Sequence, residues 1–78
     1  MTLEVRIFHV RRAGCRDALL GGGLSLEQAD RWCDVWELQA AEQHRERSGS
    51  FWDDGQRWID AQIAARKTPQ AFLTRQTR

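Results

Sequence analysis

Four side chains of the chain belong to the residue types that bind zinc: Cys15, Cys33, His9 and His44. Structural zinc sites draw thiolates and imidazoles from closely spaced pairs, either Cys-x-x-Cys or two histidines about three to five residues apart. Neither spacing occurs in this sequence. We therefore predict no metal site, two reduced thiols with Cys33 as a small core residue, and His44 as a cation near a helix end.

The remaining polar residues do not have the spacing of a catalytic set. No serine, histidine and aspartate, and no cysteine and histidine, recur in the pattern that nucleophilic catalysis uses. The three glycines at residues 21–23 lack the Lys-Ser/Thr ending of a phosphate-binding loop. We expect them to end one element before a helix that Ser25 caps. The sequence therefore predicts no catalytic residue, no cofactor and no enzymatic activity.

Acidic side chains recur along the segment that follows the glycines. Because Arg31 and Arg45 are interleaved with them, we expect a solvated face, and binding of a basic partner or of a cation is the alternative. The members of this acidic stripe are Glu27, Asp30, Asp34 and Glu37.

A second candidate surface is basic and lies near the N-terminus. With 12 basic and 11 acidic side chains the net charge is +1, so no global field favours nucleic acid or a membrane surface. The predicted order of elements nevertheless resembles that of ribbon–helix–helix DNA-binding proteins, in which paired strands enter the major groove. DNA binding is therefore the alternative function, and a solvated basic edge is the structural explanation. The residues concerned are Arg6, Arg11, Arg12 and Arg16.

The elements that must position these side chains are predicted from hydrophobic spacing. Residues 3–10 alternate apolar and charged side chains at first, as a half-buried strand does. Helical periods and capping residues predict two helices, over about 26–47 and 51–67, joined by a short turn at Gly49. Residues 11–23 favour a short helix, with a second strand as the alternative.

Together these elements predict a mostly α-helical α+β fold with one N-terminal strand. An antiparallel helical hairpin would pack on the strand and the short helix. We expect a single small domain over residues 1–68 and a C-terminal tail over 69–78, after Pro69 ends the second long helix.

The tetrapeptide Arg-Trp-x-Asp occurs twice, at residues 31–34 and 57–60. On a helical wheel its two central residues face the core, while its arginine and aspartate lie on the wet side as an i,i+3 ion pair. This favours one packing solution used twice over a duplicated site. The hairpin register would set Gly55 opposite Gln43 and His44. The predicted core is Trp32, Trp36, Trp58, Ile59 and Ile63.

A lone strand is unstable in water, so the predicted N-terminal strand needs a second strand with which to pair. We expect a homodimer or a protein partner that supplies it. No apolar run is long enough to cross a bilayer and no export signal is apparent, so a cytoplasmic location is expected. The sequence predicts a small non-enzymatic protein that acts by protein–protein interaction, of which a regulatory role is one form.

The segments RWCDVWE and FWDDGQRWIDAQ resemble small uncharacterised proteins of high-GC, actinobacterial-type bacteria. Those proteins share a Trp-Cys-Asp-x-Trp-Glu helix and a downstream Trp-rich helix, and the resemblance covers about residues 24–67. The use of eleven arginines against one lysine, with no asparagine or tyrosine, also indicates a high-GC genome. The resemblance implies no activity and no site residues.

Overall fold

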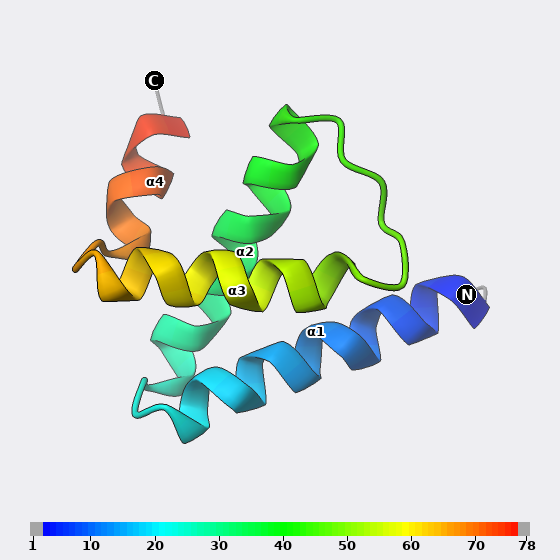
Figure 1. Cartoon of the computed structure of the whole chain (residues 1–78), viewed down its shortest axis with the longest axis horizontal. Helices are drawn as coiled ribbons and strands as arrows, with labels where there is room; N and C mark the ends of the chain where they lie inside the picture. The colour runs from blue at the N-terminus through cyan, green and yellow to red at the C-terminus, as the bar shows by residue number, and fades with distance from the viewer. Residues whose placement is uncertain (1–2, 77–78) are drawn as a thin grey trace.

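The computed structural model describes residues 3–76, and these form four α-helices. The helices are α1 (Leu3–Gly21), α2 (Leu26–Glu42), α3 (Phe51–Ala64) and α4 (Pro69–Gln76). α1 and α3 lie side by side and run in the same direction, and α2 crosses behind them at a steep angle (Figure 1). α4 stands beyond the end of α3 and packs on α2. The resulting body measures 35 × 31 × 19 Å, so its short axis is two helices thick.

The predicted N-terminal strand is wrong. Residues 3–10 are the first half of α1, which continues without a break to Gly21. Phe8, Arg12 and Cys15 recur at helical spacing on the inner face, and they are at least partly buried. This period extends over the full helix and prevails over the short alternation at its start. The predicted α+β fold class is therefore replaced by an all-α arrangement throughout the described residues.

The two long helices are both shorter than predicted. α2 ends at Glu42, because His44 adopts a left-handed conformation (φ 53°) and the two amides after the cap bond back into the last turn. The His44 amide donates to the Ala41 carbonyl at 3.1 Å, and the Arg45 amide donates to the Ala40 carbonyl at 2.8 Å. This is a Schellman motif with a histidine where glycine is usual.

α3 ends in the same way. Arg66 is left-handed (φ 61°) and its amide donates to the Ile63 carbonyl at 2.9 Å, which stops the helix at Ala64. α1 ends with glycine in the corresponding place, since Gly23 has a φ of 104°. Ser25 then caps α2 as predicted, because its hydroxyl accepts from the Gln28 amide at 3.2 Å.

The predicted antiparallel hairpin is also wrong. The connection over residues 43–50 is long enough for α3 to cross α2 instead of folding back along it (Figure 1). As a result Gly55 does not face Gln43 and His44. It lies under the indole of Trp36, where an added Cβ would come within 2.5 Å of the ring.

The predicted tail is largely helical. Pro69 begins α4. Proline suits the first helical position because the N–H there has no partner within the helix, so its absence costs no hydrogen bond, and because the φ of proline is fixed near the helical value. The Phe72 ring packs 5.9 Å from Trp32 and 5.3 Å from Trp58 between ring centroids. The last part of the predicted tail, residues 77–78, lies outside the described residues.

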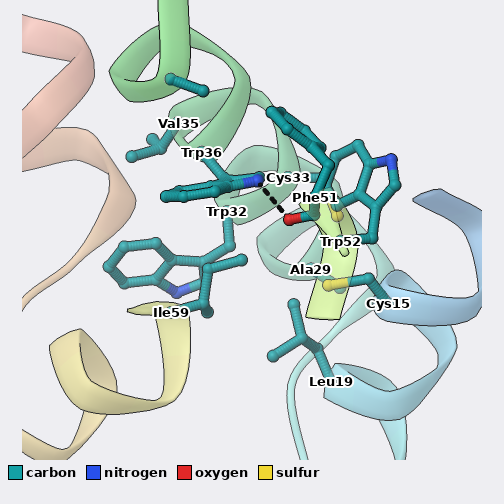
Figure 2. Packing of buried hydrophobic residues seen from close by; sticks show 11 residues of the cluster. Cys15, Leu19, Ala29, Trp32, Cys33, Val35, Trp36, Phe51, Trp52 and Ile59 are labelled. Atoms are coloured by element: carbon teal, nitrogen blue, oxygen red, sulfur yellow. Dashed lines mark hydrogen bonds between the residues drawn. The ribbon is translucent and has the colours of Figure 1, made fainter. Parts of the chain in front are cut away.

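The core holds or contacts every phenylalanine and tryptophan of the chain, and Figure 2 shows the four of them that are buried, Trp32, Trp36, Phe51 and Trp52. Three of the five predicted core residues, Trp32, Trp36 and Ile59, are fully buried, whereas Trp58 and Ile63 are partly buried at its edge. The Trp36 indole N–H donates to the Phe51 carbonyl at 3.1 Å. The buried residues are Cys15, Leu19, Ala29, Trp32, Cys33, Val35, Trp36, Ala40, Phe51, Trp52 and Ile59.

Candidate functional site

Arg12 fastens α1 to α2 and is a structural residue. Its guanidinium donates to the Asp34 carboxylate at 2.8 Å and to the Glu37 carboxylate, and its plane lies over the Trp52 ring. Burial lowers the pKa of Arg12, but the hydrogen bond to Asp34 and the charge of Glu37 outweigh burial and leave the pKa raised. Half of the predicted acidic stripe therefore serves to hold α1.

The repeated tetrapeptide keeps its predicted packing but not its predicted ion pairs. The central residues of each copy face the core, with only Trp58 partly exposed. Arg31 pairs with Glu27, one turn earlier, at 2.5 Å, and Arg57 pairs with Asp54. The aspartates of the two copies are thus left for other roles: Asp34 binds Arg12, and Asp60 has no ion-pair partner among the described residues.

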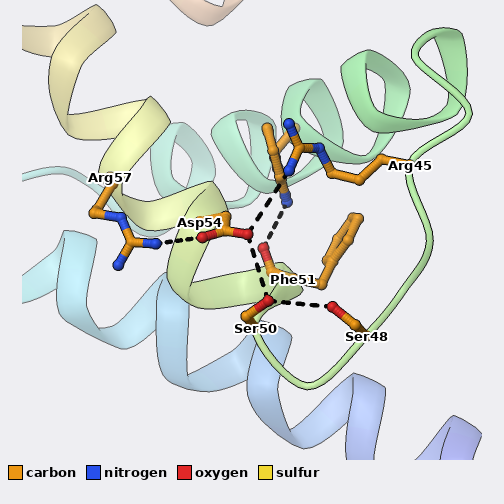
Figure 3. Close-up of polar contacts among 7 residues, drawn as sticks. Arg45, Ser48, Ser50, Phe51, Asp54 and Arg57 are labelled. Atoms are coloured by element: carbon orange, nitrogen blue, oxygen red, sulfur yellow. Dashed lines mark hydrogen bonds and ion pairs between the residues drawn. The ribbon is translucent and has the colours of Figure 1, made fainter.

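Asp54 organises the entry to α3 (Figure 3). Its carboxylate binds Arg57, lies 3.7 Å from the Arg45 guanidinium and accepts from the Ser50 hydroxyl at 3.5 Å. Ser50 precedes the helix as predicted but makes no side-chain capping bond, because its hydroxyl is turned to Asp54 and Ser48. This cluster fixes residues 43–50 to the helix and leaves no group free for chemistry.

The four arginines of the DNA-binding alternative do not form one surface. Arg12 faces inward, Arg16 pairs with Asp17 at 3.4 Å, and Arg11 donates to the Gly49 carbonyl at 2.7 Å. Arg6 is exposed near the start of α1. Two of the four charges are therefore neutralised by carboxylates.

A groove lies between α1 and α3. It encloses a volume of about 310 Å³. The α1 side carries a cation and an open backbone, and the α3 side carries a carboxylate and an amide. Its floor is made of the Cys15 thiol and the Trp52 indole. The lining residues are Arg11, Gly14, Cys15, Trp52, Asp53 and Gln56. We call this feature the α1–α3 groove.

The α3 rim of the groove is acidic. Asp53, Gln56 and Asp60 follow one another at spacings of three and four residues and so lie on one side of α3. Asp53 and Asp60 are exposed, and neither has an ion-pair partner within residues 3–76. Both carboxylates raise the pKa of Cys15, although the hydrogen bond from Cys33 outweighs them.

Two thiols meet behind the groove floor. Cys15 of α1 and Cys33 of α2 are free, buried and within hydrogen-bonding reach of each other. Figure 2 shows both sulfur atoms in the layer between the two helices. The hydrogen bond from the Cys33 thiol, helped by the charge of Arg12, lowers the pKa of Cys15 against the combined effect of burial and the carboxylates of Asp60 and Asp53. The same bond and burial raise the pKa of Cys33 far above its usual value.

Trp52 leaves one polar group unsatisfied at this site. Its indole N–H is buried and has no hydrogen-bond partner among the residues described. Figure 2 shows this nitrogen turned toward α1 and away from the rest of the aromatic cluster. A buried indole N–H usually donates to an acceptor, so the Trp52 N–H is an unsatisfied hydrogen-bond donor beside the groove.

The residues weighed for zinc do not converge. His9 and His44 are exposed on α1 and after α2, while the two cysteines are buried together. Within residues 3–76, no three side chains of the histidine, cysteine, aspartate or glutamate type are grouped so as to hold a metal ion. None of the helices in the same range has the length and apolar character to cross a membrane.

Sequence reasoning missed the groove because it assigned residues 3–10 to a strand. The helical spacing of Phe8, Arg12, Cys15 and Leu19 is the signal that would have placed Gly14 and Cys15 beside a second helix. Comparison of the chain with known family models, curated proteins and solved structures gives no match.

Proposed function

We propose that the protein acts without catalysis by binding another protein, and that a helix of this partner docks in the α1–α3 groove. The observation that carries the proposal is a groove between two parallel helices with an acidic rim that the described residues leave unpaired. We further propose a cytoplasmic location, which the two free thiols support.

The shape of α1 supports a helical occupant. Val10, Gly14 and Ala18 follow one another at i,i+4 spacing and form an exposed row along the edge of α1 that borders the groove. Val10 is 72% exposed, and a Cβ built on Gly14 meets no atom within 4 Å. Small side chains let a third helix approach closely, since the distance between packed helices depends on the side chains at the contact. The larger apolar side chain of Val10 would then be covered.

The charge of the rim defines the chemistry of the partner. Asp53 and Asp60 lie two turns apart on α3, so they match lysines or arginines at the same spacing on a helix that runs alongside. Arg11 lies across the groove from Asp53, and its guanidinium would form an ion pair with one acidic residue of the partner. The proposed occupant is therefore a mostly basic amphipathic helix with a small-residue or aliphatic face.

The same observations make the protein-binding proposal stronger than the DNA-binding one. Phosphate binding depends on cations that are free to meet the backbone, and Arg12 and Arg16 are already paired with carboxylates. The acidic rim across the groove from Arg11 would repel a phosphate backbone. The homodimer was predicted because a lone strand needs a partner strand. Residues 3–10 are helical and Phe8 packs on Phe51 of the same chain, so this argument for a homodimer no longer applies.

Site-specific photocrosslinking in the source cell tests the proposal. The variant Gln56→p-benzoylphenylalanine places the probe on the groove rim, and the control Glu46→p-benzoylphenylalanine places it on the exposed connection after α2. We expect one discrete protein adduct from position 56 that is absent from position 46. A second copy of this chain in the adduct would make the groove a dimer interface. Identical adducts from both positions, or none from position 56, would refute docking in the groove.

A further inference from the structure

The two cysteines of the chain are both buried in the core, and Figure 2 shows their sulfur atoms in the same layer between α1 and α2. Cys15 and Cys33 come from different helices, α1 and α2, and are the only sulfur atoms of the core. Neither lies in a sequence pattern that predicts pairing, so this placement is a property of the tertiary structure. Their surroundings are unequal: Cys15 lines the α1–α3 groove, whereas Cys33 is 0% exposed behind it.

We propose that Cys15 is a modification site for hydrogen peroxide and that Cys33 resolves it, so that oxidation joins α1 to α2 by a disulfide. The geometry that carries this is one thiol that lines a surface groove and a second, fully buried thiol whose sulfur lies in the same layer between α1 and α2 (Figure 2). The inference does not depend on what binds in the groove.

Access assigns the two roles. A small oxidant can reach the Cys15 sulfur through the groove, which is far larger than a peroxide molecule. Cys33 has no such path, because it is enclosed by core side chains. The hydrogen bond from Cys33 and, more weakly, the charge of Arg12 lower the pKa of Cys15, whereas burial and the carboxylates of Asp60 and Asp53 raise it. The net pKa of Cys15 is lowered, and the thiolate is the form that attacks peroxide.

The chemistry proceeds in two balanced steps. The Cys15 thiolate attacks one peroxide oxygen, the O–O bond breaks, and the departing hydroxide takes a proton and leaves as water, so that Cys15 becomes a sulfenic acid. Oxidation of Cys15 removes the thiolate to which Cys33 donated its hydrogen bond, which was the main cause of the raised pKa of Cys33. Cys33 then gives up its proton and attacks the Cys15 sulfur, the S–O bond breaks, and the departing hydroxide takes that proton and leaves as a second water. In sum, two thiols are oxidised to one disulfide, and one hydrogen peroxide is reduced to two waters.

The neighbouring contacts keep the two helices in place for the second step. Arg12 lies nearly one turn before Cys15 and binds Asp34, the residue after Cys33, at 2.8 Å. This ion pair holds α1 and α2 together at the level of the two sulfurs. The resolving thiol is therefore already next to its target and does not have to cross the fold.

The test is a peroxide titration of the whole folded chain followed by mass spectrometry. With one equivalent of hydrogen peroxide, the wild-type chain should lose two hydrogen atoms and yield a single peptide pair linked through Cys15 and Cys33. In the presence of dimedone, the Cys33→Ala chain should carry one adduct on Cys15. The matched Cys15→Ala chain should stay unlabelled at the same peroxide concentration.

Two results would overturn the proposal. One is a wild-type chain whose thiols both survive peroxide in the folded state and react only after denaturation. The other is oxidation that begins at Cys33 or yields only disulfides between chains. Circular dichroism establishes whether each variant is folded. The wild-type titration needs no substitution, so it decides the matter even if a variant fails to fold.

Discussion

Substitution of two helical glycines by alanine should have opposite effects, and the structure gives the magnitude of each. At Gly55, a Cβ would lie 2.5 Å from both Cδ1 and Nε1 of Trp36, well inside the contact distance of about 3.5–4.0 Å for unbonded heavy atoms. The indole cannot move aside freely, because it is buried and donates to the Phe51 carbonyl at 3.1 Å. Gly55→Ala must therefore distort the core or break this bond.

The expected cost follows from these contacts. Overpacking a dense core costs about 1–3 kcal/mol, and leaving the Trp36 N–H without an acceptor costs about 1–3 kcal/mol. The better helix propensity of alanine returns about 1 kcal/mol. We expect Gly55→Ala to lower the free energy of unfolding by about 1–5 kcal/mol, the upper end applying if the core is distorted and the hydrogen bond is also lost. Gly14→Ala in α1 meets no atom within 4 Å, so it should raise this free energy by about 0.5–1 kcal/mol.

Urea denaturation followed by tryptophan fluorescence measures both variants against the wild-type chain. A Trp36→Leu background gives a further check, because it removes the aromatic ring that the new methyl group would meet and the N–H that donates to the Phe51 carbonyl. In that background the cost of Gly55→Ala should become smaller, which a double-mutant cycle detects as coupling. If Gly55→Ala is as stable as the wild-type chain, or if both glycine variants shift in the same direction, α3 does not cross α2 at Trp36 as described.

Three further predictions concern helix ends, the α1–α2 contact and the thiols. His44→Gly and Arg66→Gly should each raise the free energy of unfolding by about 0.5–1 kcal/mol, because glycine adopts the left-handed backbone without strain. Gly23→Ala should lower the free energy of unfolding by about 1 kcal/mol for the converse reason. Thermal melts that rank the three variants otherwise would contradict the left-handed backbone at these three helix ends. Arg12→Leu should cost about 1–2 kcal/mol, since Asp34 and Glu37 lose their cation at a half-buried place; an unchanged denaturation midpoint would show that the pair is not formed. The oxidised chain should be about 3 kcal/mol more stable than the reduced one in the chain-entropy account, because the disulfide closes a loop of about 19 residues; equal midpoints with and without reductant would contradict this.

Local signals predicted much of the helical framework. Ser25 as a cap, the start of a helix at Phe51, and the inward faces of α2 and α3 follow from capping chemistry and a helical period, which depend on neighbouring residues alone. Cys33 is a buried core residue as predicted for the same reason. These features needed no knowledge of what lies across the core.

Features set by tertiary contacts were not predictable in the same way. The first apolar residues alternate, and the helical spacing of Phe8, Arg12 and Cys15 outweighs this alternation because these side chains contact α3 and α2. The ends of α2 and α3 were missed because His44 and Arg66 adopt a left-handed backbone that sequence rules reserve for glycine. The groove depends on how α1 lies against α3, so it could not be found before α1 was known to be a helix.

The most direct test of the proposed function is the yield of the position 56 photocrosslink when the acidic rim is neutralised. The double variant Asp53→Asn and Asp60→Asn keeps the shape of the rim and removes its two unpaired charges, and Glu46→Gln removes an exposed charge elsewhere as the matched control. If a basic helix docks in the α1–α3 groove, the double variant should lower the yield about tenfold, equivalent to about 1.4 kcal/mol of lost binding, while the control leaves it unchanged. An undiminished yield from the double variant, or an equal loss in the control, would contradict docking against the acidic rim.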